Sequence, residues 1–349
     1  MLSLRSRGQL KNKVVLPDTF GQHQTRLKEY LEALLPDTSH PLHDVAAHHF
    51  SDPGKLLRGM TAMACAEALK VDDIAALRWA MSVEMLHNAS LVHDDLCDGD
   101  EIRRNRMTVW KLFGDQQAIC FGDWLVAKSF ELAAEAAQSN HMQSMKLVTS
   151  LAQHMSVLSS GQALEFVATK YPDWDGYKRV VYGKTSPLII APVEGAILMA
   201  GGDTNTDAIS EVLSSLGLAY QISDDIRNIL GTDGAQHAVG DLKRRAPNAV
   251  IVQFRETLKN GNLEAFDNWL ASGHVHNLDL WLQEINASNA LNAAACEIEK
   301  CLDYVDTALN DISPELVSVL SPLMFFLADS CMQATAQVAD AQRTVRVLS

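Results

Sequence analysis

The residues best suited to chemistry lie in two short acidic segments. In the first, Asp94 and Asp98 are four residues apart, so on a helix they share one face, with Asp95 beside them. His87 lies two helical turns earlier on the same stripe. Carboxylates packed this closely repel one another unless a cation lies between them. A small, hard divalent cation that also binds substrate phosphates suits such a set of oxygen ligands, although a solvated acidic helix end is the alternative.

The second acidic segment repeats this spacing. It contains Gln221, Asp224, Asp225 and Asn228, at the end of a mostly apolar stretch. Acidic pairs at the C-terminal end of a helix oppose the helix dipole. Because this unfavourable arrangement occurs twice, we expect it to serve a purpose. Helical bundles often hold metal sites between facing helices, so the two segments are predicted to hold a metal–diphosphate cluster.

The elements that must position these residues are predicted to be helices. Apolar residues recur at intervals of three and four, and no convincing strand pattern or repeat is found. The predicted helices cover residues 26–35, 55–69, 73–96, 116–137, 142–170, 175–199, 207–230 and 246–259, with further segments up to 345. We therefore expect one all-α domain over residues 18–349, preceded by a flexible extension at 1–17.

The composition excludes some classes of protein. Acidic residues outnumber basic ones by 43 to 29, for a formal charge of −14, which disfavours nucleic-acid binding. An anionic substrate would need local Lys and Arg, or bound metal, for positive charge. The six cysteines form no C-x-x-C pair and are expected to be free thiols. Prolines and acidic residues interrupt the apolar stretches at 186–202 and 312–332, so we expect buried helices, no membrane span and a cytoplasmic protein.

Five sequence elements, in order, resemble those of the trans-isoprenyl diphosphate synthases, the polyprenyl synthetase family. Residues 54–58 resemble a G-K-x-x-R element, 84–95 the helix leading into the first Asp-rich motif, 103–108 an R-R-G-x-x-T element, 183–185 a K-T element and 220–225 the start of the second motif. Each element alone is a weak signal, whereas the ordered set is specific.

The resemblance implies a single large helical bundle around a central cavity, the isoprenoid synthase-type fold. It also implies a magnesium-dependent prenyltransferase, expected as a homodimer, that condenses isopentenyl diphosphate with an allylic prenyl diphosphate. Three Mg²⁺ ions would bridge the motifs to the allylic diphosphate, two held by Asp94 and Asp98 and the third by Asp224, within the metal set Asp94, Asp95, Asp98, Asp224, Asp225 and Asn228. The catalytic residues would be Asp94, Asp98, Lys184 and Asp224. Arg103, Lys184, Thr185 and Gln221 would hold the allylic diphosphate, and Lys55, Arg58, His87 and Arg104 isopentenyl diphosphate.

The resemblance also places the determinants of product length one and two turns before Asp94, at Leu86, Ala89 and Ser90. The small Ala89 and Ser90 leave room for a growing chain, so a product longer than fifteen carbons, and most simply of twenty, is expected. Phe121 or Leu125 on a neighbouring helix could close the cavity instead.

The sequence departs from the family pattern in three places. Asn228 stands where the second motif usually has a third aspartate, and Gly59 replaces a common proline. The segment 240–247 is shortened and lacks a G-K pair, so Lys243, Arg244 or Arg245 could supply its cation. Two alternatives therefore stay open: a terpene synthase on the same scaffold, and a non-catalytic partner subunit. The complete isopentenyl set argues against the first, and the retained aspartates argue against the second.

Overall fold

The structure, a computed structural model, describes residues 18–137, 141–167, 170–202, 207–232, 239–273 and 276–348. The extension predicted at 1–17 lies outside these residues. The helices are α2 (Asp18–Leu34), α3 (His43–Phe50), α4 (Leu57–Ala68), α5 (Asp73–Asp98), α6 (Val109–Phe113), α7 (Asp115–Glu135), α8 (His141–Val167), α9 (Trp174–Lys184), α10 (Pro187–Met199), α11 (Asp207–Leu230), α12 (Gly240–Arg244), α13 (Ala249–Thr257), α14 (Gly261–Ser272), α15 (Leu278–Ala287), α16 (Ala290–Ala308) and α17 (Pro314–Leu348). A single 3₁₀ turn, η1 (Leu309–Asp311), precedes α17. The prediction of an all-α fold is confirmed.

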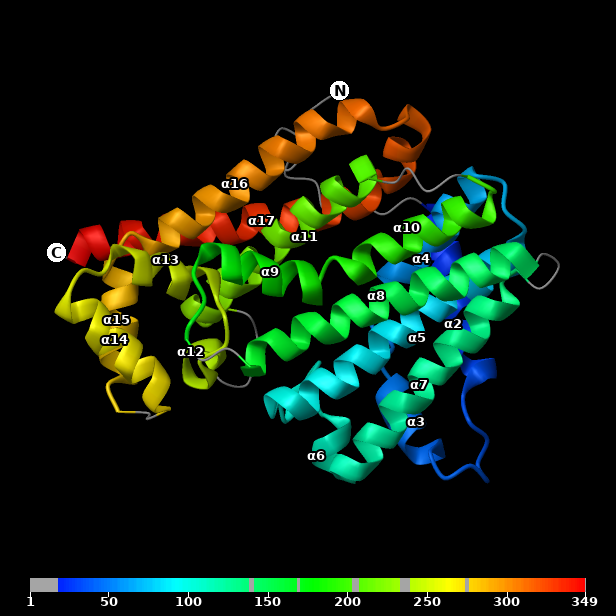
Figure 1. Ribbon diagram of the computed structural model, residues 1–349, viewed down its shortest axis with the longest axis horizontal. Coiled ribbons are helices and arrows are strands. Elements are labelled where there is room, and N and C mark those ends of the chain that lie inside the picture. The colour runs from blue at the N-terminus through cyan, green and yellow to red at the C-terminus, as the bar shows by residue number, and fades with distance from the viewer. Residues whose placement is uncertain are drawn as a thin grey trace.

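The long helix α5 is the main support of the bundle (Figure 1). It packs against α7 on one side and against α4 and α10 on the other. The Asp72 side chain accepts hydrogen bonds from the N–H groups of Ile74 and Ala75, which fixes where α5 begins. Gly99, with φ +70°, ends the helix in the left-handed conformation that glycine adopts without strain. The first acidic segment therefore lies in the last turn of a firmly anchored helix.

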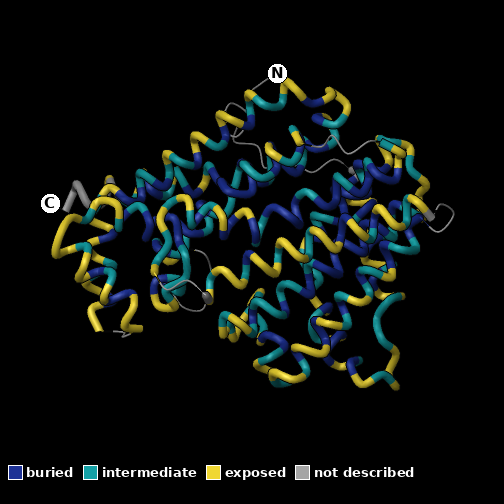
Figure 2. Tube along the Cα trace, viewed as in Figure 1, coloured by how far each residue is buried: buried dark blue, intermediate teal, exposed yellow. Residues whose placement is uncertain are grey.

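A second group of helices completes the bundle. Helix α11, which ends with the second acidic segment, packs against α16 and α17 and also contacts α9, α10 and α13. Buried residues follow the inward faces of the long helices, whereas α14 and α15 at one end expose much of their surface (Figure 2). The two acidic segments are thus carried by separate helices that belong to one packed core.

The structure differs from the prediction of one helix over 175–199. That stretch forms α9 and α10, which are separated at Thr185 and Ser186. Pro187 is the first residue of α10, a position where its missing N–H is not needed, whereas inside a continuous helix it would remove a backbone hydrogen bond. The break has a consequence for the site, because it places Lys184 and Thr185 at the end of α9.

A small hairpin follows the first acidic segment, where no strand was predicted. Strand β1 (Ile102–Arg103) pairs with the antiparallel strand β2 (Arg106–Met107). The two turn residues, Arg104 and Asn105, have φ angles of +52° and +61°. A two-residue hairpin turn requires this conformation, and asparagine tolerates it better than most residues.

Helix α17 is apolar over most of its length. Within the described residues, its segment Pro314–Ala341 is the one helix long and apolar enough to cross a membrane by length and composition, and 39% of its most apolar window is buried inside the protein. It packs against α4, α11 and α16, which accounts for much of its apolar character. The expected absence of a membrane span stays a prediction.

Candidate active site

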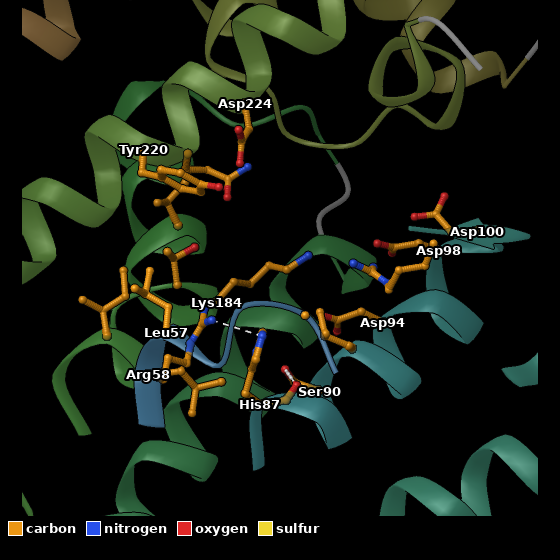
Figure 3. A pocket seen from close by; sticks show the side chains of 18 of the residues that line it. Leu57, Arg58, His87, Ser90, Asp94, Asp98, Asp100, Lys184, Tyr220 and Asp224 are labelled. Atoms are coloured by element: carbon orange, nitrogen blue, oxygen red, sulfur yellow. Dashed lines mark hydrogen bonds between the residues drawn. The ribbon is translucent and has the colours of Figure 1, made fainter. Parts of the chain in front are cut away.

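A cavity of about 1320 Å³ lies between α4, α5, α9, α10, α11 and α17. Figure 3 shows Asp94 and Asp98 on one side of it, Asp224 across from them, and Lys184 between the two. Its apolar walls come from residues such as Leu57, Leu91, Val181, Leu188, Ile189, Pro192 and Leu323. The cavity therefore combines charged side chains with apolar walls.

The first acidic segment presents two of its three carboxylates to this cavity. Asp94 and Asp98 line it, together with His87 and Ser90 from the same face of α5. Burial raises the pKa of Asp94 to about 6, although the nearby Lys184 opposes the rise. A carboxylate that is costly to ionise without a counter-charge is suited to a site that receives a cation.

Asp95 has a different environment. Its side chain is 5% exposed and accepts hydrogen bonds from Arg103, at 2.7 Å from Nε and 2.6 Å from Nη2. Arg103 lines the cavity, whereas Asp95 is not one of the residues that line it. The geometry makes Asp95 the residue that orients Arg103.

In the second segment, the carboxylates are already engaged within the protein. Asp224 lines the cavity, and its Oδ1 lies 2.8 Å from Nη1 of Arg227. Asp225 is buried and accepts hydrogen bonds from the Tyr177 hydroxyl, the Ala249 N–H and the Gln221 amide. Burial and the neighbouring charge of Asp241 raise the pKa of Asp225. Gln221, predicted to bind diphosphate, thus lines the cavity while its amide holds Asp225.

Asn228 lines the cavity as well. Its side-chain oxygen accepts the N–H of Asp241 at 3.2 Å, a bond that fixes the start of α12. The amide that replaces the usual third aspartate is therefore used to hold the following segment.

Lys184 extends from the break between α9 and α10 into the middle of the cavity (Figure 3). Its Nζ lies 2.8 Å from Oε2 of Glu165 on α8. Burial alone would lower the pKa of Lys184, but the charges of Glu165, Asp94 and Asp98 outweigh it and raise the pKa. Lys184 is thus a fixed cation beside the first segment. Thr185, predicted to lie beside it, also lines the cavity.

The four residues predicted to bind isopentenyl diphosphate all line the cavity. Arg58 donates from Nη1 to Nε2 of His87 at 3.1 Å, as the dashed line in Figure 3 shows. Burial, followed by the charge of Arg58, holds the pKa of His87 well below its ordinary value, so the imidazole is neutral and accepts this hydrogen bond. Lys55 Nζ lies 4.3 Å from the ring centre of Phe326. Arg104 donates to the Asp52 carbonyl at 2.7 Å.

Sequence reasoning missed Glu84, a buried carboxylate that also lines the cavity. Its Oε1 accepts the N–H of Gly59 at 2.7 Å. Leu56, which precedes α4, is in the left-handed conformation and provides no side-chain cap, so Glu84 supplies the capping acceptor from α5. The bond also gives Gly59 a role, since a proline at this position would have no N–H to donate. Glu165 was missed for the same reason: each is a single acidic residue whose partner is distant in sequence.

The basic residues of the shortened segment separate into two groups. Lys243 and Arg244 line the cavity, and Arg244 pairs with Asp100 and Asp241. The guanidinium of Arg245 stacks on the ring of Trp269 at 3.7 Å, and Arg245 is not among the cavity-lining residues. Of the three, Lys243 and Arg244 are therefore placed to meet a diphosphate.

The residues predicted to set product length are also separated by the fold. Ser90 lines the cavity, while Leu86 and Ala89 are buried in the core and are not part of its lining. His93, on the same helical stripe as those two, contacts Gly122 of α7. Leu86 and Ala89 thus face α7, and the effect of all three on product length stays a prediction.

The family model described as polyprenyl synthetase matches residues 39–309. The chain belongs to the polyprenyl synthetase family. An octaprenyl diphosphate synthase of Haemophilus influenzae is 27% identical over 271 residues, which cover 72% of this chain and 78% of that protein. A (2E,6E)-farnesyl diphosphate synthase of Mycobacterium bovis is 34% identical over 181 residues, which cover 51% of this chain and 50% of that protein.

The fold of this family member is also that of solved family structures. The crystal structure of a polyprenyl synthase from Caulobacter crescentus, complexed with calcium and isoprenyl diphosphate, superposes with a TM-score of 0.75 at 22% identity and covers 91% of this chain and 99% of that one. The predicted isoprenoid synthase-type fold is confirmed. As a member of this family, the chain is a trans-prenyltransferase of isoprenoid biosynthesis.

The donors of the first segment fit a divalent metal ion. Asp94 and Asp98 offer hard carboxylate oxygens to the cavity. Among the described residues, no group of three or more His, Cys, Asp or Glu side chains is placed to hold a metal ion. Substrate phosphate oxygens and water would complete the coordination shell. The second segment fits a metal less well, because Asp224 is paired with Arg227 and Asp225 is already satisfied.

Proposed function

We propose that this chain is a Mg²⁺-dependent synthase that condenses isopentenyl diphosphate with an allylic prenyl diphosphate. The observation that carries the proposal is the arrangement of one cavity. Its lining brings together Asp94, Asp98 and Lys184, the hydrogen-bonded Arg58–His87 pair, and apolar walls. Asp94, Asp98 and Lys184 suit an allylic diphosphate, because they can hold a metal ion and supply a positive charge. Arg58 and the other cations of the lining suit the diphosphate of the second substrate. The apolar walls suit the prenyl chain.

The charged residues around Asp94 would stabilise the departure of the allylic diphosphate. As the carbon–oxygen bond breaks, negative charge develops on the leaving diphosphate, and the fixed cations Lys184 and Arg103 would stabilise it without having to reorganise. A divalent ion bound by Asp94 and Asp98 would supply Lewis acidity at the phosphate oxygens. The two carboxylates would hold the ion, while Glu165 holds Lys184 in place and Asp95 holds Arg103.

The remaining steps need no protein base. Lys55, Arg58 and Arg104 would hold isopentenyl diphosphate so that its double bond attacks the allylic cation and a new carbon–carbon bond forms. The proton lost from the resulting cation passes to the departed diphosphate. His87 already accepts a hydrogen bond from Arg58, which supports a positioning role for this imidazole.

Product length, assembly and location are parts of the same proposal. A twenty-carbon product is supported by Ser90, a small side chain on the cavity wall. The named relatives include farnesyl and octaprenyl diphosphate synthases, so the family accommodates shorter and longer products. A homodimer in the cytoplasm is the expected form of the enzyme.

The test is incubation of the purified chain with Mg²⁺, labelled isopentenyl diphosphate and a C10 or C15 allylic primer. Incorporation of label into a longer prenyl diphosphate supports the proposal. A hydrocarbon or alcohol formed from primer alone indicates a terpene synthase, and turnover only after a second protein is added indicates a partner subunit.

A matched pair of variants checks the site. Lys184→Gln removes the cation beside Asp94 and Asp98 and should lower kcat by about 100-fold or more, the usual cost of removing one preorganised charge. Lys178→Gln on the same helix removes a cation that pairs with Asp175 at the surface, and it should leave kcat unchanged.

A further inference from the structure

The second acidic segment contains a cation of its own. The first segment, 94–98, has three carboxylates and no basic residue, whereas 224–228 has two carboxylates, Arg227 and the neutral Asn228. Arg227 lies between the two positions that would be expected to bind a metal ion, Asp224 and Asn228. Its contacts show what it does there.

Arg227 is fixed against Asp224. Its Nη1 lies 2.8 Å from Oδ1 of Asp224, and its side chain is 14% exposed. The same guanidinium donates from Nη2 to the carbonyl and, at 2.9 Å, to the hydroxyl of Ser330 on α17, and from Nη1 to the Ser223 hydroxyl at 3.3 Å. Acceptors on two helices thus surround one guanidinium. A flexible surface ion pair would have no such frame.

The other two side chains of the segment are committed elsewhere. Asp225 is held by three donors from α9, α11 and α13. The Asn228 oxygen accepts the Asp241 N–H, which ties α11 to the start of α12. A divalent ion at this segment would therefore have to compete with a guanidinium for Asp224, and the nearby Asp241 carboxylate is itself paired with Arg244.

We propose that the guanidinium of Arg227 replaces a divalent metal ion at the second acidic segment. The chain would then bind an allylic diphosphate with the ions held by Asp94 and Asp98 only. A guanidinium supplies one positive charge that cannot be lost near neutral pH, and it balances the Asp224 carboxylate without coordination chemistry. The inference rests on the proposed function, since the diphosphate concerned is that of the allylic substrate.

The replacement changes how diphosphate is held on this side of the cavity. With the charge of Asp224 balanced by Arg227, the segment repels an incoming diphosphate less than three unpaired carboxylates would. Lys184, Lys243 and Arg244, which all line the cavity, are the cations placed to contact the diphosphate directly. Diphosphate binding should therefore need less divalent metal than a site with two metal-binding motifs.

The test counts the divalent ions bound per chain, with Mn²⁺ and inorganic pyrophosphate as the probes. Titration of the full chain at saturating pyrophosphate, followed by Mn²⁺ electron paramagnetic resonance, should give about two ions per chain. Asp94→Asn should lower the number by at least one, whereas Asp224→Asn should leave it unchanged. The double change Arg227→Leu with Asn228→Asp should add one ion.

Two controls isolate the effect of the guanidinium. Arg227→Lys keeps the positive charge and should keep the wild-type number of ions. Arg255→Leu breaks a comparable pair, with Nε 2.6 Å from Asp267 and an arginine side chain 24% exposed, and it lies outside the cavity lining. It should also keep the wild-type number. If the double variant does not fold, the wild-type and Asp224→Asn measurements still decide the question.

Three ions in the wild type, or the loss of one ion in Asp224→Asn, would overturn the inference. If such a protein still incorporates labelled isopentenyl diphosphate, the proposed function stands while the inference fails. A wild-type chain that binds neither pyrophosphate nor Mn²⁺ would overturn both.

Discussion

Glu84 offers a test of how the isopentenyl site is positioned. The carboxylate is 3% exposed and caps α4 through the Gly59 N–H at 2.7 Å, in the turn that carries Arg58. Burial lowers the pKa of the Arg58 guanidinium, and the nearby negative charge of Glu84 opposes that shift without reversing it. Glu84→Gln keeps the shape of the side chain and an acceptor oxygen but removes the charge.

The magnitude follows from the two contacts. A hydrogen bond to a charged group contributes about 1.5–3 kcal/mol, and a buried cation left without its counter-charge can cost about 3–5 kcal/mol. Because the amide oxygen introduced by Glu84→Gln would still accept the Gly59 N–H, we expect the free energy of unfolding to fall by about 2–3 kcal/mol. If about 1.4 kcal/mol of this appears as misplacement of Arg58, the KM for isopentenyl diphosphate rises about tenfold.

The assay has two parts. Urea denaturation measures the free energy of unfolding, and initial rates give KM for each substrate separately. Glu131→Gln on α7 is the control, since this glutamate is 51% exposed and forms a surface pair with Lys128. It should change stability by less than about 0.5 kcal/mol. Equal increases in KM for both substrates, or unchanged stability in Glu84→Gln, would refute the assignment of Glu84 as a positioning residue for Arg58.

Three further predictions concern other parts of the cavity. Folding raises the pKa of Asp94 from 3.8 to about 6, so without metal the protein should lose at most about 3 kcal/mol of stability as pH rises from 4 to 6. Asp94→Asn should flatten this pH dependence in thermal melts with EDTA. An unchanged slope in the variant would show that Asp94 is not the source of the dependence. Ser90→Phe should shorten the products seen by mass spectrometry, because Ser90 lines the cavity. Ala89→Phe should mainly destabilise the core, by about 1–3 kcal/mol, because Ala89 is buried outside the lining. An unchanged product distribution in Ser90→Phe would show that Ser90 does not limit product length. Arg245→Ala removes the stack on Trp269 that holds the shortened segment, so Lys243 should be less well positioned and the KM for the allylic diphosphate should rise about threefold to tenfold. An unchanged KM would show that the segment is held by other contacts.

The sequence predicted the helices well because their apolar periodicity is long and regular. It also located the last turn of α5, since Gly99 is a strong stop signal. The break between α9 and α10 was missed although Pro187 marks it, because apolar residues continue on both sides. The short hairpin was missed because two-residue strands have no periodicity to detect.

The predicted site residues fall into groups that spacing alone could not separate. Helical spacing places Asp94, Asp95 and Asp98 together, but only the packing of α5 shows that Asp95 faces Arg103. The partners of Glu84 and Glu165 lie 25 and 19 residues away in sequence, so no local pattern reveals them. Arg227 was visible as a cation inside an acidic motif, yet its meaning depends on Ser330 of α17.

The central claim is that one cavity joins an allylic diphosphate to isopentenyl diphosphate. The most direct measurement is mass spectrometry of the prenyl diphosphates formed from a C15 allylic primer and deuterated isopentenyl diphosphate, with Mg²⁺ and with EDTA. We predict a labelled diphosphate one isoprene unit longer than the primer, formed only with the metal ion. Primer that is hydrolysed or cyclised without taking up label, or left unchanged with Mg²⁺ present, would contradict the claim.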